Sequence, residues 1–303
     1  MNLSYDSPTS IKAFLEAEGL AMSKRFGQNF LIDKNARERL HAVLETAKPS
    51  HIWEIGPGIG SITSILLEHG HRVTAFEIDH GFARVLRDIF GKTPDFRLVE
   101  GDFLKTWKTE LVAAGTGPAS GAPASGAAVS APAPDFIFGN LPYNAALAII
   151  ADLLEECLLP PRMIFTVQKE AARRIAAGPG TKDYSAFSVL CASVCRTKIL
   201  YDIGASSFWP QPRVTSSVVA LVPRPDPVAA NDRKGFSRFA RAAFASRRKT
   251  LRNNLASLGL YPAGNPSILE EILASMSIPS DIRAEALTAE QLATIYFALK
   301  AAR

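Results

Sequence analysis

The sequence predicts a doubly wound α/β domain followed by a small all-helical domain. Short apolar strands alternate with helix-length periodic segments from residue 51 onward, a pattern typical of a parallel sheet with crossover helices. A glycine-rich turn follows the first strand, and polar side chains follow the next ones, at the edge where such sheets bind ligands. The proline-rich stretch PRPDP (223–227) precedes a wholly helical pattern. We therefore expect domains over residues 1–223 and 224–303.

The composition is that of a folded chain without a membrane span. Its 303 residues are 47% hydrophobic, and no run approaches the roughly 18 apolar residues that a span requires. The first residues lack the basic and apolar segments of a secretory signal. The three cysteines, Cys157, Cys191 and Cys195, form no C-x-x-C, and the His and Cys spacings are not those of a metal site. These features predict reduced thiols, a cytoplasmic location and no metal.

The positive charge is concentrated at the C-terminal end. The net charge is +5, and residues 224–303 contain 12 Lys/Arg against 7 Asp/Glu, so they hold the whole excess. Residues 233–252 carry eight bases and no acid, and we expect them to form one helix with an apolar stripe on its other side. A solvated face is the plain alternative. A dense basic face favours polyanion binding, with the candidate contacts Arg241, Arg247, Arg248, Lys249 and Arg252.

Two helices and a loop are expected before the first strand. The helices cover residues 8–21 and 34–47, and Asp33 is the expected N-cap of the second. The loop at residues 23–33 mixes bases, aromatics and amides beside Gly27. It is either a plain connector or a lid over a ligand, with Lys24 and Arg25 as candidate RNA contacts.

The glycine-rich turn follows the strand HIWEI (51–55) and opens a helix that ends near Gly70. Gly56, Gly58 and Gly60 allow the backbone to approach a ligand at a helix N-terminus. The next strand ends at Glu77, which lies 21 positions after Gly56, where a βαβ unit places a carboxylate on ribose hydroxyls. The alternative for Glu77 is an ordinary charge at a strand end. Because no Lys or Arg lies in the turn, a nucleoside without phosphates, such as S-adenosylmethionine, fits better than NAD or ATP.

Two further strands end in polar residues at the same predicted edge. The strand that begins at residue 96 leads to Asp102, which can accept a hydrogen bond from an adenine amino group, and to Phe103, which can pack on the ring. The strand FIFG (136–139) leads to Asn140. Between them, residues 113–134 are dominated by Ala, Gly, Pro and Ser without charge. We expect this insertion to be disordered, remote from the site and dispensable.

The segment Asn140 to Tyr143 has the parts needed to methylate an exocyclic amine of a nucleobase. Such an amine is a poor nucleophile because its lone pair is delocalised into the ring. The Asn140 side-chain carbonyl and the Leu141 backbone carbonyl can accept its N–H groups and return electron density to nitrogen. Pro142 stiffens the turn and Tyr143 offers a face on which the base can stack. The alternative is an ordinary Asn-x-Pro turn.

The rest of the first domain continues the alternation. We expect helices over residues 145–158, from 169, and over 184–193, and strands over 162–168 and 198–203. A proline-containing loop from Phe208 then enters a strand that reaches residue 219. Phe208 is either a core aromatic or a second face for the base, opposite Tyr143.

Taken together, eight segments resemble the KsgA/RsmA family of ribosomal RNA adenine dimethyltransferases. The resemblance covers the chain from about residue 22 to the C-terminus, apart from the insertion. It is carried by KRFGQNFL (24–31), EIGPGIGSIT (54–63), FEID (76–79), GDFL (101–104), GNLPYN (139–144), FTVQKE (165–170), FWPQPRVTSSVV (208–219) and FASRRKTLRNNL (244–255).

This resemblance implies a Rossmann-like fold that uses S-adenosylmethionine to dimethylate two adjacent adenines. They lie in the 3′-terminal hairpin of 16S rRNA within an immature small subunit, and a role in subunit biogenesis is implied. We expect a monomer. The implied cofactor contacts are Asn29, Leu31, Gly56, Gly58, Glu77, Asp102, Phe103 and Asn140. Asn140, Leu141, Tyr143 and Phe208 would hold the target adenine.

Three other functions remain possible on the sequence. An enzyme resembling the macrolide-resistance methyltransferases would dimethylate one large-subunit adenine, but those commonly read Asn-Ile-Pro-Tyr where this chain has NLPY (140–143). A DNA adenine methyltransferase shares the Asn-x-Pro-Tyr logic only. A ribosome-assembly factor would bind immature subunits without needing catalysis.

Overall fold

The computed structural model describes residues 3–20, 28–44, 48–113, 133–257 and 267–302. The loop residues Lys24 and Arg25, and nearly all of the insertion at 113–134, lie outside these ranges. No helix within the described ranges is long and apolar enough to cross a membrane.

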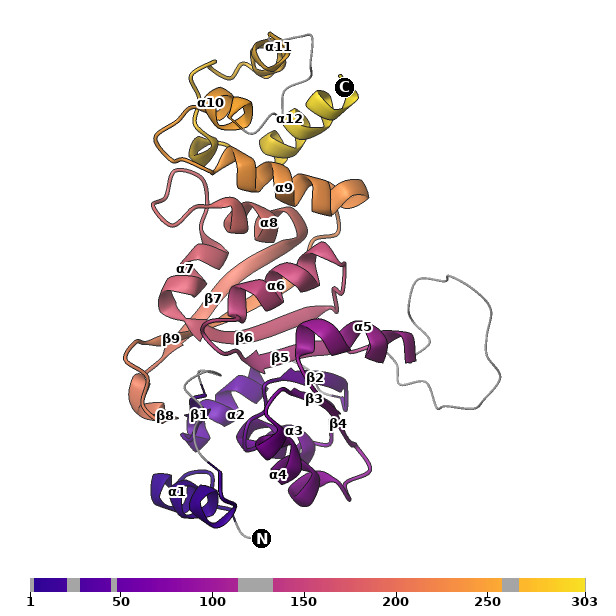
Figure 1. The fold of residues 1–303 in the computed structure, drawn as a ribbon, viewed down its shortest axis with the longest axis vertical. Helices are drawn as coiled ribbons and strands as arrows, with labels where there is room; N and C mark the ends of the chain where they lie inside the picture. Colours follow the sequence, from indigo (N-terminus) through magenta and orange to yellow (C-terminus); the bar gives the residue numbers. More distant parts are fainter. Residues whose placement is uncertain (1–2, 21–27, 45–47, 114–132, 258–266, 303) are drawn as a thin grey trace, which may run out of the picture. The chain divides into compact units, whose positions relative to one another are not determined.

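The described strands form a seven-stranded sheet in the order β4-β3-β2-β5-β6-β9-β7 (Figure 1). Strands β4, β3, β2, β5 and β6 are parallel to their neighbours. The strand order reverses between β2 and β5. This reversal is the switch point at which such sheets bind ligands. The strands are β2 (His51–Ile55), β3 (Arg72–Glu77), β4 (Phe96–Glu100), β5 (Phe136–Asn140), β6 (Arg162–Gln168), β7 (Cys195–Ile203) and β9 (Ser216–Pro223).

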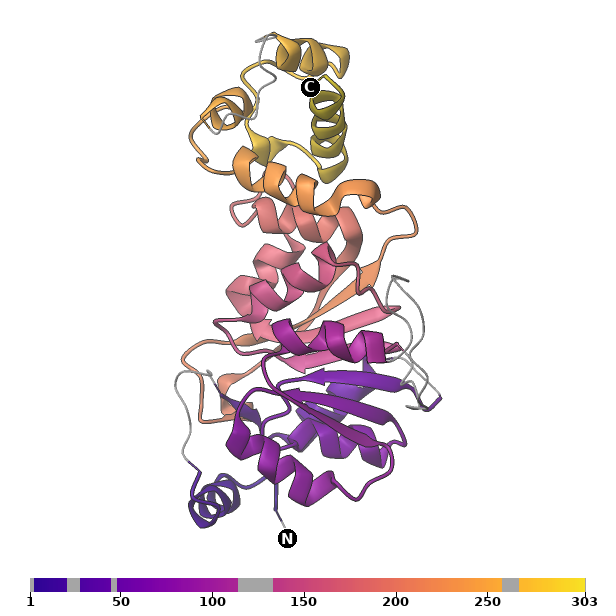
Figure 2. The same ribbon diagram turned by 45° about the vertical axis from the view of Figure 1, so that its right-hand side comes forward.

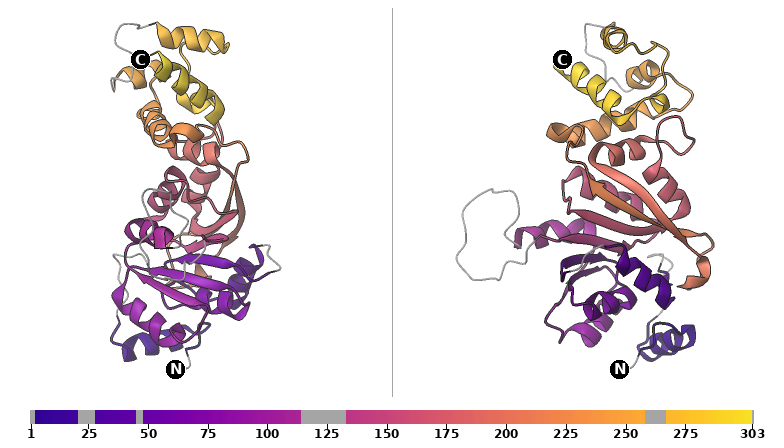
Figure 3. Two further views of the ribbon diagram at one scale, coloured as in Figure 1. Left: turned by 90° about the vertical axis from the view of Figure 1, so that its right-hand side faces the viewer. Right: turned by 180° about the vertical axis from the view of Figure 1, so that it is seen from behind.

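Eight α-helices and one small strand pair accompany the sheet within the described residues. The central strand β2 is buried along its whole length, as expected for a parallel strand covered on both faces. Figure 3 shows α3 and α4 beside β2, β3 and β4. The helices are α1 (Pro8–Ala17), α2 (Lys34–Ala42), α3 (Ser61–Glu68), α4 (His80–Phe90), α5 (Phe103–Ala113), α6 (Ala146–Glu155), α7 (Lys169–Ala176) and α8 (Ala186–Val194). The short strands β1 (Phe30–Leu31) and β8 (Phe208–Trp209) pair antiparallel.

Local sequence signals explain where these helices begin. The Asp33 side chain accepts the Ala36 N–H at 3.0 Å, which confirms Asp33 as the N-cap of α2. Asp79 caps α4 in the same way. The N-cap of α3 is Gly60, whose φ of +83° lies in the left-handed region that favours glycine.

The last part of the chain forms four further α-helices in the described residues, which lie together in Figure 2. Their apolar faces share one core with α8, into which Phe236, Leu255 and Leu292 are buried. The helices are α9 (Arg233–Ala243), α10 (Leu251–Ala256), α11 (Ile268–Ser275) and α12 (Ala289–Ala301). The expectation of one basic helix over residues 233–252 is wrong, because the segment 244–250 separates α9 from α10.

The described chain divides into two compact units. Unit 1 comprises residues 1–150, 159–169 and 200–220, and unit 2 comprises 151–158, 170–199 and 221–303. This division differs from the expected boundary between residues 223 and 224. The physical reason is visible in the core of unit 2, where Tyr184 and Val189 are buried with the C-terminal helices.

Candidate methyl-transfer site

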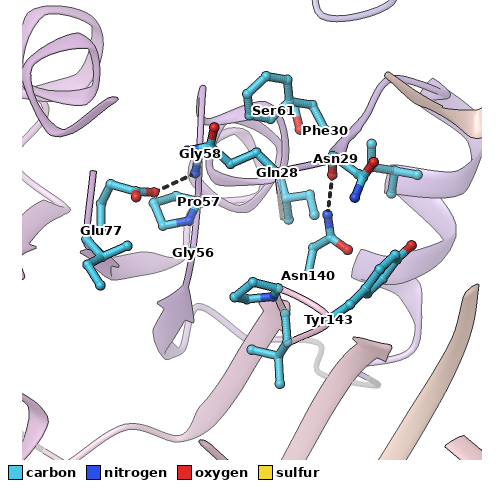
Figure 4. A pocket seen from close by; sticks show the side chains of 15 residues that line it. Gln28, Asn29, Phe30, Gly56, Pro57, Gly58, Ser61, Glu77, Asn140 and Tyr143 are labelled. Carbon is cyan, nitrogen blue, oxygen red and sulfur yellow. Dashed lines mark hydrogen bonds between the residues drawn. The ribbon is translucent and has the colours of Figure 1, made fainter. Parts of the chain in front are cut away.

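A pocket in unit 1 lies at the carboxyl ends of β2, β3 and β5 (Figure 4). It has about 630 Å³ of empty space, part of which is open to solvent. Strand β1 and the residues just before it also contribute to its wall. Its lining residues are Gln28, Asn29, Phe30, Leu31, Gly56, Pro57, Gly58, Ser61, Ile62, Glu77, Ile78, Asn140, Leu141, Pro142 and Tyr143.

The glycine turn after β2 lines the pocket with Gly56, Pro57 and Gly58. Gly56 and Gly58 have φ values of +70° and +59°, which other residues rarely adopt. A Cβ on Gly58 would lie 2.7 Å from the Phe30 ring, so a larger residue would displace that ring. Glycine therefore allows the turn and β1 to pack closely while both line the pocket.

Glu77 ends β3 with its carboxylate held against the glycine turn. Its Oε2 accepts the Gly58 N–H at 3.0 Å and its Oε1 accepts the Asp79 N–H at 2.9 Å. Burial raises the pKa of Glu77 to about 7, although the two backbone hydrogen bonds oppose this shift. Each carboxylate oxygen has a second lone pair, so the group can accept hydrogen bonds from a diol in the pocket.

Asn140 is oriented by the chain segment before β1. Its Nδ2 donates to the Asn29 carbonyl oxygen at 2.7 Å (Figure 4). A backbone carbonyl can only accept, so the nitrogen end of the amide must face Asn29. The Asn140 Oδ1 is consequently the end that is left for a ligand with N–H groups.

Tyr143 lines the pocket three residues after Asn140. Its hydroxyl lies 2.8 Å from the Ser216 Oγ, and Ser216 is fully buried in β9. Burial raises the pKa of Tyr143, which keeps the phenol neutral near pH 7. The hydrogen bond holds the Tyr143 ring in one orientation.

Three expected site residues do not line this pocket. Phe208 is 2% exposed in a core cluster with Leu31 and Leu40, so the structure favours the core alternative over the base-stacking one. Phe103 is also buried, between Phe76 and Trp107. Asp102 follows β4 by two residues, and its carboxylate accepts the Leu104 N–H at 3.1 Å at the start of α5.

The expected RNA contacts in unit 2 fall into two groups. Three arginines pair with acids: Arg241 with Glu155 at 3.2 Å, Arg247 with Glu285 at 3.0 Å, and Arg252 with Glu270 at 2.9 Å. Arg248 and Lys249 are exposed in the segment between α9 and α10. These two residues therefore present the least compensated charge of the five.

Sequence reasoning missed several pocket residues. Phe30, Ser61, Ile62 and Ile78 line the pocket without having been singled out. Each of them closely follows a predicted feature: Asn29, the glycine turn or Glu77. Their adjacency to these features could have predicted that they line the pocket.

The comparisons with known proteins agree with this geometry. The family described as "Ribosomal RNA adenine dimethylase" matches residues 19–297. A Treponema denticola protein named "Ribosomal RNA small subunit methyltransferase A" is 42% identical over 93% of this chain and 91% of its own length. A Borreliella afzelii protein of the same name is 39% identical over 89% of this chain and 87% of its own.

Two solved structures share the fold. The crystal structure of a dimethyladenosine transferase from Plasmodium falciparum has a TM-score of 0.70 at 19% identity, covering 89% of this chain and 97% of that one. The 23S rRNA methyltransferase ErmE has a TM-score of 0.59 at 21% identity, covering 89% of this chain and 99% of its own. With its glycine turn, its strand-end Glu77 and its NLPY segment assembled in one pocket, the chain belongs to the ribosomal RNA adenine dimethylase family.

Proposed function

We propose that this protein dimethylates two adjacent adenines in the 3′-terminal hairpin of 16S rRNA, using S-adenosylmethionine. Family membership supports the reaction class. The observation that carries the proposal is the Asn140 amide, whose nitrogen is held by Asn29 and whose oxygen is thereby available to an adenine amine. We further propose that the enzyme acts as a cytoplasmic monomer on an immature small subunit.

The pocket fits a nucleoside methyl donor. Gly56 and Gly58 carry no side chain at two positions of one wall, and Glu77 can accept ribose hydroxyls beside them. Among the described residues that line this pocket there is no Lys or Arg, which favours a methyl donor without a phosphate chain. When bound, S-adenosylmethionine supplies a methyl group on positively charged sulfur. Because that methyl group is already activated, we propose that the transfer needs no metal.

The residues around Asn140 would act on the adenine amine. The Asn140 Oδ1 and the Leu141 backbone carbonyl accept its two N–H groups, which keeps the nitrogen lone pair available for in-line attack. Tyr143, held by Ser216, offers its ring to the base after the base leaves the RNA stack. The proton of the methylated amine, which is strongly acidic, passes to water.

Other cofactor contacts form part of the same proposal. Asn29 and Leu31 line the pocket beside Asn140, and Asp102 is proposed to accept from the adenine amino group of the methyl donor. Phe103 would contribute indirectly, by supporting the wall of the pocket, because its ring is already packed against Phe76 and Trp107.

The reaction is tested with labelled S-adenosylmethionine and small ribosomal subunits that lack the modification. We expect label in two adjacent dimethyladenosines near the 3′ end of 16S rRNA. Label in 23S rRNA instead would indicate a large-subunit enzyme. Tight subunit binding without any label would indicate an assembly factor.

A role in subunit biogenesis is tested separately from methylation. An Asn140→Ala chain that no longer methylates but still supports small-subunit maturation would show that the two roles are distinct. Loss of maturation together with methylation would tie biogenesis to catalysis.

A further inference from the structure

A cluster of histidines lies on unit 1, away from the residues that line the methyl-transfer pocket. Three of the five histidines of the chain, His41, His69 and His71, take part, together with Glu38. Sequence spacing did not reveal the cluster because its members come from α2, from the end of α3 and from the turn into β3. Packing of α2 against α3 brings them together.

The positions of Glu38, His41 and His69 suit a common ligand. Glu38 and His41 are three residues apart on α2, so they lie on one helix face. His69 is the C-cap residue of α3, and its Nε2 lies 3.3 Å from the Glu38 Oε2. One ligand atom from each of the three residues lies within 4.8 Å of the other two. Tetrahedral Zn²⁺, with bonds of about 2.0–2.1 Å to nitrogen and oxygen, separates its ligand atoms by about 3.3 Å.

The imidazole rings of His41 and His69 lie side by side. They stack with centroids 3.7 Å apart at an interplanar angle of 11°. Rotation of each ring about its χ2 bond, which is a soft torsion, is required to direct both lone pairs at one ion.

A hydrogen bond from His71 determines which nitrogen of His41 is unprotonated. The Ser50 N–H donates to the His71 Nδ1 at 3.1 Å, so a neutral His71 carries its proton on Nε2. That nitrogen lies 2.9 Å from the His41 Nε2, which must then be the acceptor and be unprotonated. A metal ion would take over this lone pair from the hydrogen bond to His71.

We propose that Glu38, His41 and His69 bind one Zn²⁺ ion, with solvent as the fourth ligand. Two imidazoles and a carboxylate form a donor set that zinc accepts readily and that Mg²⁺ does not favour. The ion joins the C-terminal half of α2 to the end of α3. Its role is to stabilise unit 1, and it takes no part in methyl transfer.

The test is Zn²⁺ binding by the full chain, measured by isothermal titration calorimetry and checked by equilibrium dialysis. We expect one ion per chain, and at least a tenfold weaker affinity in each of Glu38→Gln, His41→Gln and His69→Gln. The matched control is His80→Gln, because His80 also contacts a glutamate, Glu100, but belongs to no group of three possible metal ligands among the described residues. Its affinity for Zn²⁺ should equal that of the wild type.

Two further readouts separate a built site from scattered surface binding. Co²⁺ in the site should give the intense visible absorption of a tetrahedral complex, and His69→Gln should abolish it. Zn²⁺ should raise the melting temperature of the wild type but not of His69→Gln, while Mg²⁺ should change neither. Circular dichroism establishes that each variant is folded. The proposal is overturned if the wild type binds no Zn²⁺, or if His69→Gln binds it as the wild type does.

Discussion

The backbone carbonyl of Asn29, on a distant segment, determines which way the side-chain amide of Asn140 faces. Asn29 O accepts from its Nδ2 at 2.7 Å, across 111 positions of sequence. This bond removes the ambiguity of an amide, whose oxygen and nitrogen ends have similar shapes. The catalytic proposal depends on this single orientation, because only the oxygen end can accept from an amine.

Asn140→Ala should reduce methyl transfer by roughly 10²- to 10³-fold, the loss typical of removing one positioned hydrogen-bonding group. Affinity for S-adenosylmethionine should be weakened but measurable, since Glu77 and the glycine turn remain. Single-turnover methylation and calorimetry measure the two effects. Asn144→Ala is the matched control, because Asn144 is an exposed amide that does not line the pocket. Unchanged turnover in Asn140→Ala would exclude the proposed mechanism.

A second residue-scale feature is the buried carboxyl of Glu54 beneath the glycine turn. Glu54 is 2% exposed on β2 and accepts the Thr63 hydroxyl at 2.6 Å. Burial raises its pKa from 4.5 to about 7; the Thr63 bond opposes the rise and Glu77 adds to it. Folding therefore favours the protonated acid, so its contribution to stability is complete below pH 4.5 and is lost as pH rises through about 7.

Glu54→Gln should remove this loss, because glutamine keeps an acceptor for Thr63 and does not titrate. Relative to wild type, the variant should gain about 1–3 kcal/mol in free energy of unfolding between pH 5 and pH 8, from 1.36 kcal/mol per pKa unit. Urea unfolding at the two pH values measures it. Glu16→Gln, an exposed glutamate on α1, is the control and should show no such gain. An equal effect of Glu54→Gln at both pH values would contradict the raised pKa.

At the scale of elements, the turn between β2 and α3 determines how closely β1 approaches the sheet. Gly58 combines a φ of +59° with a Cβ position 2.7 Å from the Phe30 ring. Phe30 in turn packs edge-on against Phe82 of α4, with ring centroids 5.4 Å apart. The turn and β1 thus form one wall of the pocket, and α4 packs against Phe30 of that wall.

Gly58→Ala should destabilise the protein by about 1–2 kcal/mol through backbone strain and by about 1–3 kcal/mol more through overpacking against Phe30. Gly19→Ala is a matched control for strain alone, because Gly19 has a φ of +64° and nothing within 4 Å of its Cβ position. Thermal unfolding and cofactor affinity measure the difference. If the two variants lost equal stability, the contact with Phe30 would carry no cost.

The segment between α9 and α10 is a second element of interest, and we propose that it contacts RNA. The Asn254 side chain donates to the Ala243 and Ser246 carbonyls at 2.7 and 3.0 Å, and it accepts the Ser246 N–H. These bonds hold the basic segment in a defined turn after α9 ends. Arg247 is tied to Glu285, whereas Arg248 and Lys249 extend to solvent.

Reversing Arg248 and Lys249 to Glu should weaken binding of small-subunit RNA and lower its salt dependence, by a slope of about 0.7–0.9 for each phosphate that the protein no longer neutralises. Filter binding across a salt series measures both quantities. The control is the double reversal of Lys12 and Lys92, two exposed lysines of unit 1. Unaltered affinity in the Arg248 and Lys249 variant would show that this segment does not dock RNA.

At the scale of the whole molecule, unit 2 is assembled from three separate stretches of chain. Tyr184 is 2% exposed within its core, and its hydroxyl donates to the Leu287 carbonyl at 2.9 Å. Tyr184 also contacts Phe244 edge-on, with ring centroids 5.5 Å apart. The C-terminal helices therefore need residues from the 170–199 stretch to complete their core.

The isolated fragment 224–303 should accordingly fail to unfold cooperatively. It lacks Tyr184 and Val189, so it leaves apolar surface of α9 and α12 uncovered. Circular dichroism during heating measures the transition, with the full chain as reference. A sharp transition in the fragment with native helical content would instead support residue 224 as the start of an independent domain.

The sequence alone was sufficient for the features that depend on local chemistry. The strand and helix pattern identified the parallel sheet, because burial imposes a readable period on each element. The glycine turn, Glu77 and Asn140 were predicted to meet because parallel strands end at one edge, and all three line the pocket. Asp33 was recognised as a cap from its place before a helical period.

Only the tertiary structure decided what depends on contacts between distant segments. Phe208 became a core residue rather than a pocket wall because its strand pairs with β1 and its ring packs beside Leu31. The break in the basic helix depends on Asn254, and the make-up of unit 2 on Tyr184. The histidine cluster depends on α2 packing against α3. Sequence periodicity specifies which face of an element is buried, but the partner that covers it is chosen by the packing of the whole chain.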